Sequence, residues 1–160
     1  AWFNPSLNSF GRIDASNTLS GATWSPSTVT YTGNNRTHMV RIPDAGRFEV
    51  RHADGSANPY LLQAGMLGLG LDGINNKRSP GKRLDINMYT QGHKLKRVKK
   101  LPKTLDKALK LFKESNVAKN AFGSSVVSKY VKLKNRELKE YAKQSEDQKS
   151  EWSRNNAIDC

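Results

Sequence analysis

The hexapeptide "GRFEVR", residues 46–51, places three charged residues at alternate positions. Side chains of a β-strand alternate between its two faces, so Arg47, Glu49 and Arg51 would share one face. A carboxylate between two guanidinium groups stays ionised and can ligate Mg²⁺ or Mn²⁺. The guanidinium groups could neutralise phosphate oxygens as charge develops. A solvated salt ladder across two strands is the other explanation, and the hexapeptide alone leaves both open.

The arginines of the first half of the chain are expected to bind specific groups rather than only to make the surface soluble. No lysine precedes Lys77, whereas five arginines do: Arg12, Arg36, Arg41, Arg47 and Arg51. The planar arginine fork is suited to bidentate binding of carboxylate and phosphate. Arg36 and Arg41 would add two more cations near the same strands. Their five-residue separation puts them on opposite faces of one strand unless a bulge intervenes.

The second half of the chain carries most of the positive charge. Residues 1–90 hold nine basic and six acidic residues, a net of +3, and residues 91–160 hold eighteen and eight, a net of +10. Lysine dominates this second part. We interpret the lysines as the solvated face of amphipathic helices, because few aromatic residues lie among them to stack on bases. Binding to nucleic acid or to an anionic surface is the alternative.

The pattern of strand-forming residues predicts a β-hairpin. "STVTYTG" (27–33) has the alternation and β-branching of a strand. A second strand is expected over 37–42, closed by Pro43, and a third over 47–51. The turn "PDAG" (43–46) joins these two, which would pair antiparallel.

Helices are predicted on both sides of a basic, irregular stretch. Asn58 as cap and Pro59 begin a helix that is apolar nearly all round, and such a helix is normally buried. Its glycines suit the close approach of another backbone. A helix capped by Thr104 and a last, long helix from about Ser124 follow. The expected fold is α+β: an antiparallel sheet whose hairpin carries the site, one buried helix and a helical C-terminal lobe.

Other residue types exclude several functional classes. The only cysteine is Cys160, which rules out an intramolecular disulfide and a cysteine metal site and fits a reducing cytoplasm. The three histidines have no metal-binding spacing, and we expect His38 and His52 to be hydrogen-bonded on the hairpin. The apolar run at 60–71 is shorter than the roughly 20 residues that span a bilayer. Because the chain opens without methionine, we expect a fragment.

Several motifs occur in an order that resembles the C-terminal part of the glutamine synthetase catalytic domain. They are "NSFGR" (8–12), "NNRTHMVRIP" (34–43), "GRFEVR" (46–51), "DGSANPYL" (54–61) and "GLDGI" (70–74). The sequence of these motifs most resembles a bacterial branch of the family, which includes the type III glutamate–ammonia ligases and the glutamate–methylamine ligases. The resemblance implies that 1–160 is a fragment of one catalytic domain without the N-terminal β-grasp domain. Residues 1–90 would hold the active-site strands and the buried helix, and 91–160 a basic helical tail.

The resemblance also implies a role for each charged residue. Arg12, Arg36 and Arg51 match arginines that bind glutamate, and Arg36 also faces the transferred phosphoryl group as a catalytic residue. The nucleotide phosphates would be bound by Arg36, Arg41 and Arg47. Glu49 matches a ligand of a divalent metal, Mg²⁺ or Mn²⁺.

The implied reaction joins glutamate to ammonia with ATP, through a γ-glutamyl phosphate. Family members commonly carry a flap glutamate after the first arginine, and the corresponding stretch "ASNTLSGATW" (15–24) has none. A glutamate–methylamine ligase is therefore the alternative. The family assembles as rings, so we expect a homo-oligomer with shared active sites, no nucleic-acid or membrane partner, and no activity from the fragment alone. The rival hypotheses are a basic nucleic-acid-binding module and a non-catalytic homologue.

Overall fold

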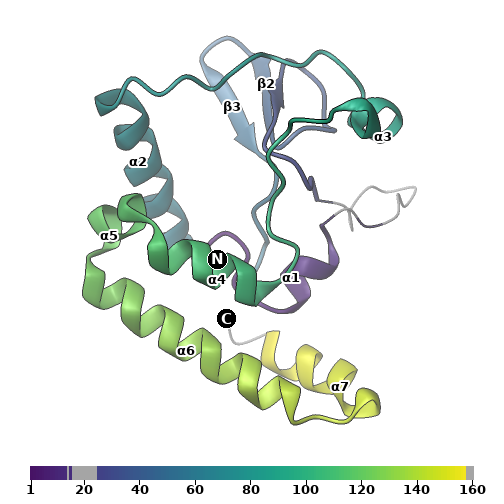
Figure 1. Cartoon of the computed structure of the whole chain (residues 1–160), viewed down its shortest axis with the longest axis vertical. Coiled ribbons are helices and arrows are strands. Elements are labelled where there is room, and N and C mark those ends of the chain that lie inside the picture. Colours follow the sequence, from purple (N-terminus) through teal and green to yellow (C-terminus); the bar gives the residue numbers. More distant parts are fainter. Residues whose placement is uncertain (14, 16–24, 158–160) are drawn as a thin grey trace. The chain divides into compact units, whose positions relative to one another are not determined.

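The computed structural model describes residues 1–13, 15 and 25–157 (Figure 1). These residues divide into two compact units. The helical unit comprises 1–10, 54–78 and the chain from Thr104 onward. The sheet unit comprises 11–53 and 79–103. Each unit is therefore assembled from stretches that are far apart in the sequence, and all five arginines expected in the site belong to the sheet unit.

The sheet unit contains a three-stranded sheet in the order β1 (Tyr31–Thr32), β2 (Val40–Asp44), β3 (Arg47–Val50). β2 and β3 form the predicted antiparallel hairpin, in which Arg41 lies opposite Glu49. Gly46 has a φ of 78°, a conformation that glycine adopts without steric cost, and it completes a tight turn between the strands. β1 pairs parallel with β2, so the sheet is mixed, and the expectation of an antiparallel sheet is wrong on this point.

The strands are shorter than the sequence pattern predicts. The expected strand at 27–33 is reduced to β1, and β2 begins at Val40 rather than at Thr37. Thr37 instead closes a turn, with its backbone N–H and its hydroxyl both donating to Asn35 Oδ1 at 3.0 and 2.8 Å. Pro43 lies within β2, next to an irregularity in the register between Arg41 and Asp44. Proline has no N–H to give the ladder, and a bulge tolerates that loss.

The stretch from Ser79 to Lys103 is anchored against β1 and the turn after it. The Leu84 N–H donates to the Tyr31 carbonyl at 3.1 Å, and the Thr32 hydroxyl donates to Asp85 at 2.8 Å. The stretch is irregular as expected, except for α3 (Met88–Gln91) and a short 3₁₀ turn (Gly92–Lys94). These bonds cover the edge of the sheet that β1 would otherwise expose.

The helical unit has a core built on α4 (Leu105–Glu114), α5 (Asn116–Phe122) and α6 (Ser124–Ala142). As predicted for the helix after Thr104, its buried residues are Leu105, Ala108, Leu109 and Phe112. The expected last helix is interrupted, and α7 (Glu146–Ala157) follows α6 as a separate helix. Four aromatic rings pack around this core, with centroids 5.0 to 6.1 Å apart: Trp2, Phe112, Phe122 and Tyr130. A further short helix, α1 (Asn8–Gly11), lies near the N-terminus.

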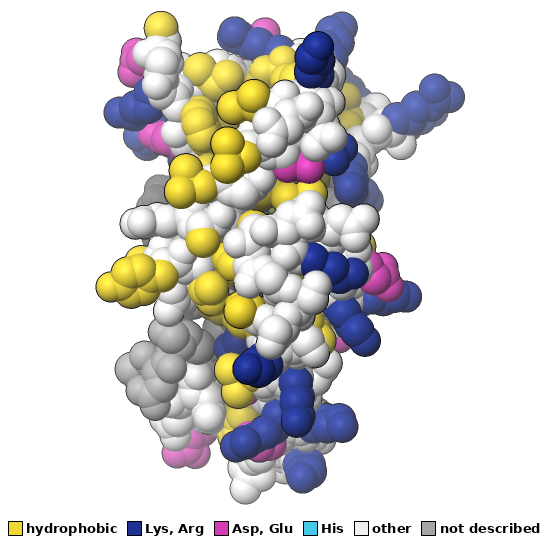
Figure 2. Space-filling model, turned by 90° about the vertical axis from the view of Figure 1, so that its left-hand side faces the viewer, with side chains coloured by type: hydrophobic (Ala, Val, Ile, Leu, Met, Phe, Trp, Pro, Cys, Tyr) yellow, Lys and Arg dark blue, Asp and Glu magenta, His cyan; other side chains and the backbone are white. Residues whose placement is uncertain are grey.

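The helix α2 (Pro59–Asn75) begins as predicted but is not buried. Asn58 caps it by accepting from the N–H groups of Tyr60 and Leu61 at 3.0 and 3.1 Å. Among its residues only Gly65 is buried, whereas Leu67 is 68% and Ile74 75% exposed. The described chain covers α2 on one side, with Trp2 against Gly65 and α5 against Gly68, and leaves the rest of its circumference open. Figure 2 shows hydrophobic side chains gathered on the corresponding face.

In the part of the chain that the structure describes, no helix combines the length and apolar character needed to cross a bilayer.

Candidate functional site

The hairpin brings a carboxylate and an arginine into a close ion pair. Arg41 of β2 and Glu49 of β3 are directly opposite in the register. The Arg41 Nη1 donates to both carboxylate oxygens of Glu49, at 2.8 and 2.9 Å. The Arg41 side chain is only 12% exposed, whereas that of Glu49 is 31% exposed. The pair is thus well fixed on the arginine side and still accessible on the carboxylate side.

Two further arginines reach the same carboxylate from β3 and its end. Arg47 Nη2 lies 3.0 Å from Glu49 Oε1, and Arg51 Nη1 lies 3.7 Å from Oε2. The predicted common face of residues 47, 49 and 51 is confirmed by these contacts. Three guanidinium groups therefore surround one carboxylate, and the cluster carries a net charge of +2.

This arrangement shifts the acid–base properties of the cluster. Hydrogen bonding from Arg41, together with the charges of Arg41 and Arg47, lowers the pKa of Glu49 below its usual value. Burial lowers the pKa of Arg51, while the charge of Glu49 opposes this effect and that of Arg36 adds to it. Arginine remains cationic nonetheless, since its ordinary pKa lies far above neutrality. The site thus presents a carboxylate ionised at neutral pH inside an excess of positive charge.

Arg36 lies in the turn between β1 and β2 and is exposed. Because it is not on a strand, the alternation that would have placed it opposite to Arg41 does not apply. The positive charge of Arg36 contributes to the lowered pKa of Arg51. The turn thus gives the cluster a fourth arginine nearby.

Two asparagines that the sequence analysis did not single out hold this turn and Arg41. Asn34 Oδ1 accepts from Arg41 Nε at 3.0 Å and also from Nη2. Asn35 binds Thr37 on one side and donates from Nδ2 to the Ile86 carbonyl at 3.0 Å on the other. The signal was available in "GNNR", since asparagine favours turns by hydrogen-bonding nearby backbone. This motif could not reveal the second partner of Asn35, the Ile86 carbonyl, which lies 51 residues away in the sequence.

His38 makes hydrogen bonds, as expected, but not across the hairpin. It is fully buried, and its ring nitrogens lie 3.0 Å from Thr30 Oγ1 and 2.9 Å from the Ile86 carbonyl. The backbone carbonyl of Ile86 is thus shared by His38 and Asn35. These two hydrogen bonds hold the residues before α3 against the turn that carries Arg36.

Arg12 is separated from the hairpin along the chain, in the turn after α1. Its carbonyl accepts from the Ser25 N–H at 2.8 Å, and its side chain is partly buried. Among the described residues, the ion pairs to Glu49 come from Arg41, Arg47 and Arg51 and not from Arg12. The stretch 16–24, where the flap glutamate is missing, lies outside the described residues.

The donor set of the cluster fits a metal that is shared with phosphate groups. Among the described residues, no three histidine, cysteine or acidic side chains come together as a metal cage. Glu49 offers a single accessible carboxylate. Mg²⁺ is commonly held by one or two carboxylates together with substrate phosphates and water, so Glu49 can be one ligand of such an ion. The surrounding arginines would contact the phosphates themselves.

Comparison with known proteins gives a consistent family. The family model described as "Glutamine synthetase, catalytic domain" matches residues 1–153. A glutamine synthetase of Rhizobium leguminosarum bv. phaseoli is 48% identical over 156 residues, which are 98% of this chain and 35% of that protein. A glutamate–methylamine ligase of Methyloversatilis universalis is 36% identical over 146 residues, 89% of this chain and 33% of that protein.

Solved structures agree with this result. A structure described as a GmaS/ADP complex matches the whole chain and 36% of its own, with a TM-score of 0.83 and 47% identity. An apo GmaS structure matches with a TM-score of 0.77 and 41% identity, over 34% of its own chain. The chain therefore spans about a third of the length of these relatives.

Proposed function

Because the chain belongs to the glutamine synthetase catalytic-domain family, we propose that it forms the arginine-lined wall of an ATP-dependent glutamate–ammonia ligase. The observation that carries this proposal is the ionised Glu49 within reach of Arg41, Arg47 and Arg51, at 2.8 to 3.7 Å. This cluster keeps an excess of two positive charges, which suits a site for anionic substrates.

The proposed chemistry has two steps. An oxygen of the γ-carboxylate of glutamate attacks the γ-phosphorus of ATP, and the bond to the departing ADP breaks. Ammonia then attacks the carbonyl carbon of the resulting γ-glutamyl phosphate, phosphate leaves and the nitrogen loses a proton. Both partners of the first step are anions, so cationic groups must neutralise them as they approach. Mg²⁺, when bound with ATP, supplies further positive charge to the phosphates.

The arginines divide between the two substrates in this proposal. Arg12 and Arg51 bind carboxylate groups of glutamate, and Arg36 contacts the transferring phosphoryl group from its exposed turn. Arg41 and Arg47 bind phosphates of ATP. Arg47 is 61% exposed, so it can rotate toward a nucleotide at small conformational cost.

Glu49 is the proposed metal ligand of this chain. Its carboxylate is held by Arg41, which is fixed in turn by Asn34. Binding of Mg²⁺ or Mn²⁺ to a free oxygen lone pair of Glu49 requires the carboxylate to be ionised, and its lowered pKa keeps it so. A homo-oligomer with shared active sites and a cytoplasmic location belong to the same proposal, by likeness to the family.

Ligation of methylamine is the second candidate. Two observations favour it: the likeness to GmaS at 47% identity, and the lack of a glutamate in residues 15–24, where the family commonly carries its flap glutamate. Either function uses the same phosphoryl-transfer wall. Residues 15–24, which lack the flap glutamate, would then determine which amine reacts.

A chimera tests both candidates. These 160 residues would replace the matching third of the Rhizobium leguminosarum enzyme, and phosphate release would be followed with Mg²⁺, ATP and glutamate. Faster turnover with ammonium supports the glutamate–ammonia ligase, and faster turnover with methylamine supports the second candidate. A chimera that assembles as the parent enzyme does and binds ADP, yet releases no phosphate with either amine, would contradict both.

A further inference from the structure

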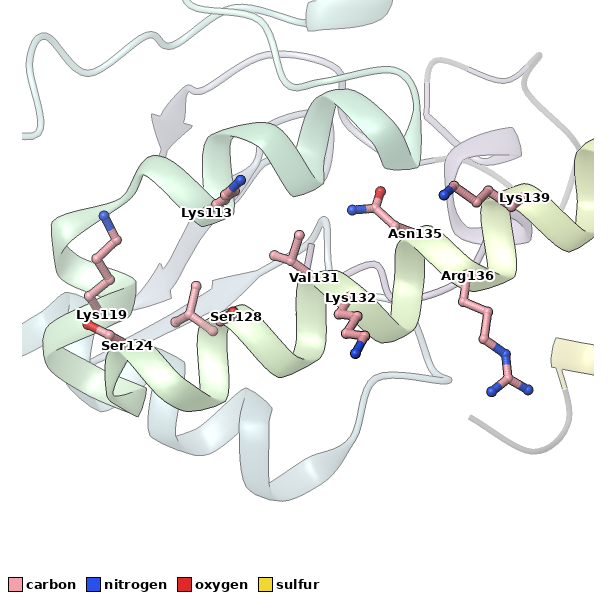
Figure 3. Close-up of a pocket in the computed structure, with 10 residues that line it drawn as sticks. Lys113, Lys119, Ser124, Ser128, Val131, Lys132, Asn135, Arg136 and Lys139 are labelled. Carbon is pink, nitrogen blue, oxygen red and sulfur yellow. The ribbon is translucent and has the colours of Figure 1, made fainter.

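A basic groove of about 640 Å³ lies between α4 and α6 in the helical unit, with α5 at one end (Figure 3). It contains no acidic residue in its lining. Five cationic side chains line it: Lys113, Lys119, Lys132, Arg136 and Lys139. Such a concentration of one sign of charge in a concave surface raises the local concentration of anions.

Most of this charge has no neutralising partner. Arg136 pairs with Glu140 at 2.9 Å on its own helix, and Figure 3 shows its side chain directed away from α4. Across the described ranges of the chain, no ion pair involves Lys113, Lys119, Lys132 or Lys139. Figure 3 shows the Lys132 ammonium directed away from α4, as that of Arg136 is, so the uncompensated lysines that remain along the groove are Lys113, Lys119 and Lys139.

The dimensions of the groove favour a single extended chain. Its lining runs along α6 from Ser124 to Lys139, which is about 22 Å at a rise of 1.5 Å per residue. A path of about 22 Å accommodates six or seven residues of extended peptide.

The chemistry of the lining favours a peptide over a nucleotide or a single-stranded nucleic acid. It contains no aromatic ring on which a base could stack. Val127 and Val131 form an apolar floor, and the lysine stems add further methylene groups. Figure 3 shows Asn135 and Lys139 directed toward α4. An amide and several ammonium groups over an apolar floor match a peptide with both carboxylates and small apolar side chains.

We propose that this groove binds an extended acidic segment of a partner protein. Carboxylates of the segment pair with the unpaired Lys113, Lys119 and Lys139, and its small apolar side chains rest on the floor between α4 and α6. Asn135 offers an amide donor and acceptor to the peptide backbone. The inference stands on the helical unit alone and does not depend on the proposed ligase activity.

Binding would be measured on the 160-residue chain by fluorescence anisotropy. The probe is a labelled ten-residue peptide of alternating glutamate and alanine. We expect it to bind, and we expect the same peptide with glutamine in place of glutamate not to bind. The double variant Lys113→Glu/Lys139→Glu should weaken binding at least tenfold.

A matched variant separates the groove from the general charge of the chain. Lys110→Glu/Lys129→Glu changes one exposed lysine on each of the same two helices, outside the groove, and should weaken binding less than twofold. Circular dichroism would verify that both variants keep their helices. Equal weakening by the two variants would overturn the proposal. So would displacement of the probe by tripolyphosphate or single-stranded oligothymidine at lower concentration than by unlabelled peptide.

Discussion

Glu49 illustrates how much chemistry a single position can acquire from its neighbours. Its carboxylate has an ordinary pKa in a free chain, and three arginines, on β2, on β3 and directly after β3, surround it and help to hold it ionised in the fold. The alternation of residues in "GRFEVR" was sufficient to predict the shared face of Arg47 and Arg51. The contribution of Arg41 depended on the strand register, which the sequence did not specify.

The Glu49→Gln substitution should make the free energy of unfolding depend less on pH in the acidic range. The pKa of Glu49 is lowered in the folded state, so its contribution is present above the unfolded value and is lost as pH falls through the folded value. The stability difference between wild type and Glu49→Gln should therefore be larger at pH 7 than at pH 3. Urea unfolding at both pH values measures it. A difference that stays constant, or grows at pH 3, would contradict the ion-pair network.

Secondary-structure elements were predicted correctly where interactions between residues close in the sequence determine them. The hairpin, the Asn58 cap and the buried face of α4 follow from turn residues, a capping side chain and helical spacing. The burial of α2 was predicted wrongly. A helix that is apolar on all sides is stabilised when other residues pack over it, but its sequence does not show whether the chain supplies those residues. Residues 37–39 were predicted as the start of a strand but lie in a turn, since Ile86, the residue that holds this turn, is distant in sequence.

Two glycines of α2 should respond in opposite ways to alanine. A Cβ at Gly68 would come within 2.5 Å of the Ala121 Cβ on α5, whereas a Cβ at Gly70 meets nothing within 4 Å. Gly68→Ala should destabilise the helical unit by about 1–3 kcal/mol through overpacking. Gly70→Ala should stabilise it by about 0.5–1 kcal/mol through helix propensity. Thermal unfolding of both variants tests this, and stabilisation by Gly68→Ala would refute the close contact of α2 with α5.

At the scale of the whole molecule, the surface is strongly cationic and also carries an uncovered apolar helix face. Contiguous exposed apolar surface marks an interaction site or favours association. The side chains concerned on α2 include Tyr60, Leu67, Leu71 and Ile74, which are 59–82% exposed. Neither composition nor mean hydropathy revealed this surface, because burial is decided by what packs on the helix.

This surface should bind a hydrophobic dye under native conditions. We expect anilinonaphthalene sulfonate fluorescence with the folded chain to fall by at least half in Leu67→Gln/Leu71→Gln/Ile74→Gln. The control, Leu111→Gln/Val126→Gln/Leu133→Gln, changes exposed apolar residues on α4 and α6 and should leave most of the signal. An equal loss in both variants would show that α2 carries no special apolar surface.

The central claim is that the Glu49 cluster is part of a catalytic wall, and phosphate release by the chimera tests it most directly. Glu49→Gln should reduce turnover with the preferred amine by at least a hundredfold, while Asp44→Asn, which neutralises an exposed carboxylate on the same hairpin, should leave it within twofold. Both variants should assemble like the unmodified chimera. If Glu49→Gln keeps full turnover in an assembled enzyme, the cluster is a structural salt ladder and the account is contradicted.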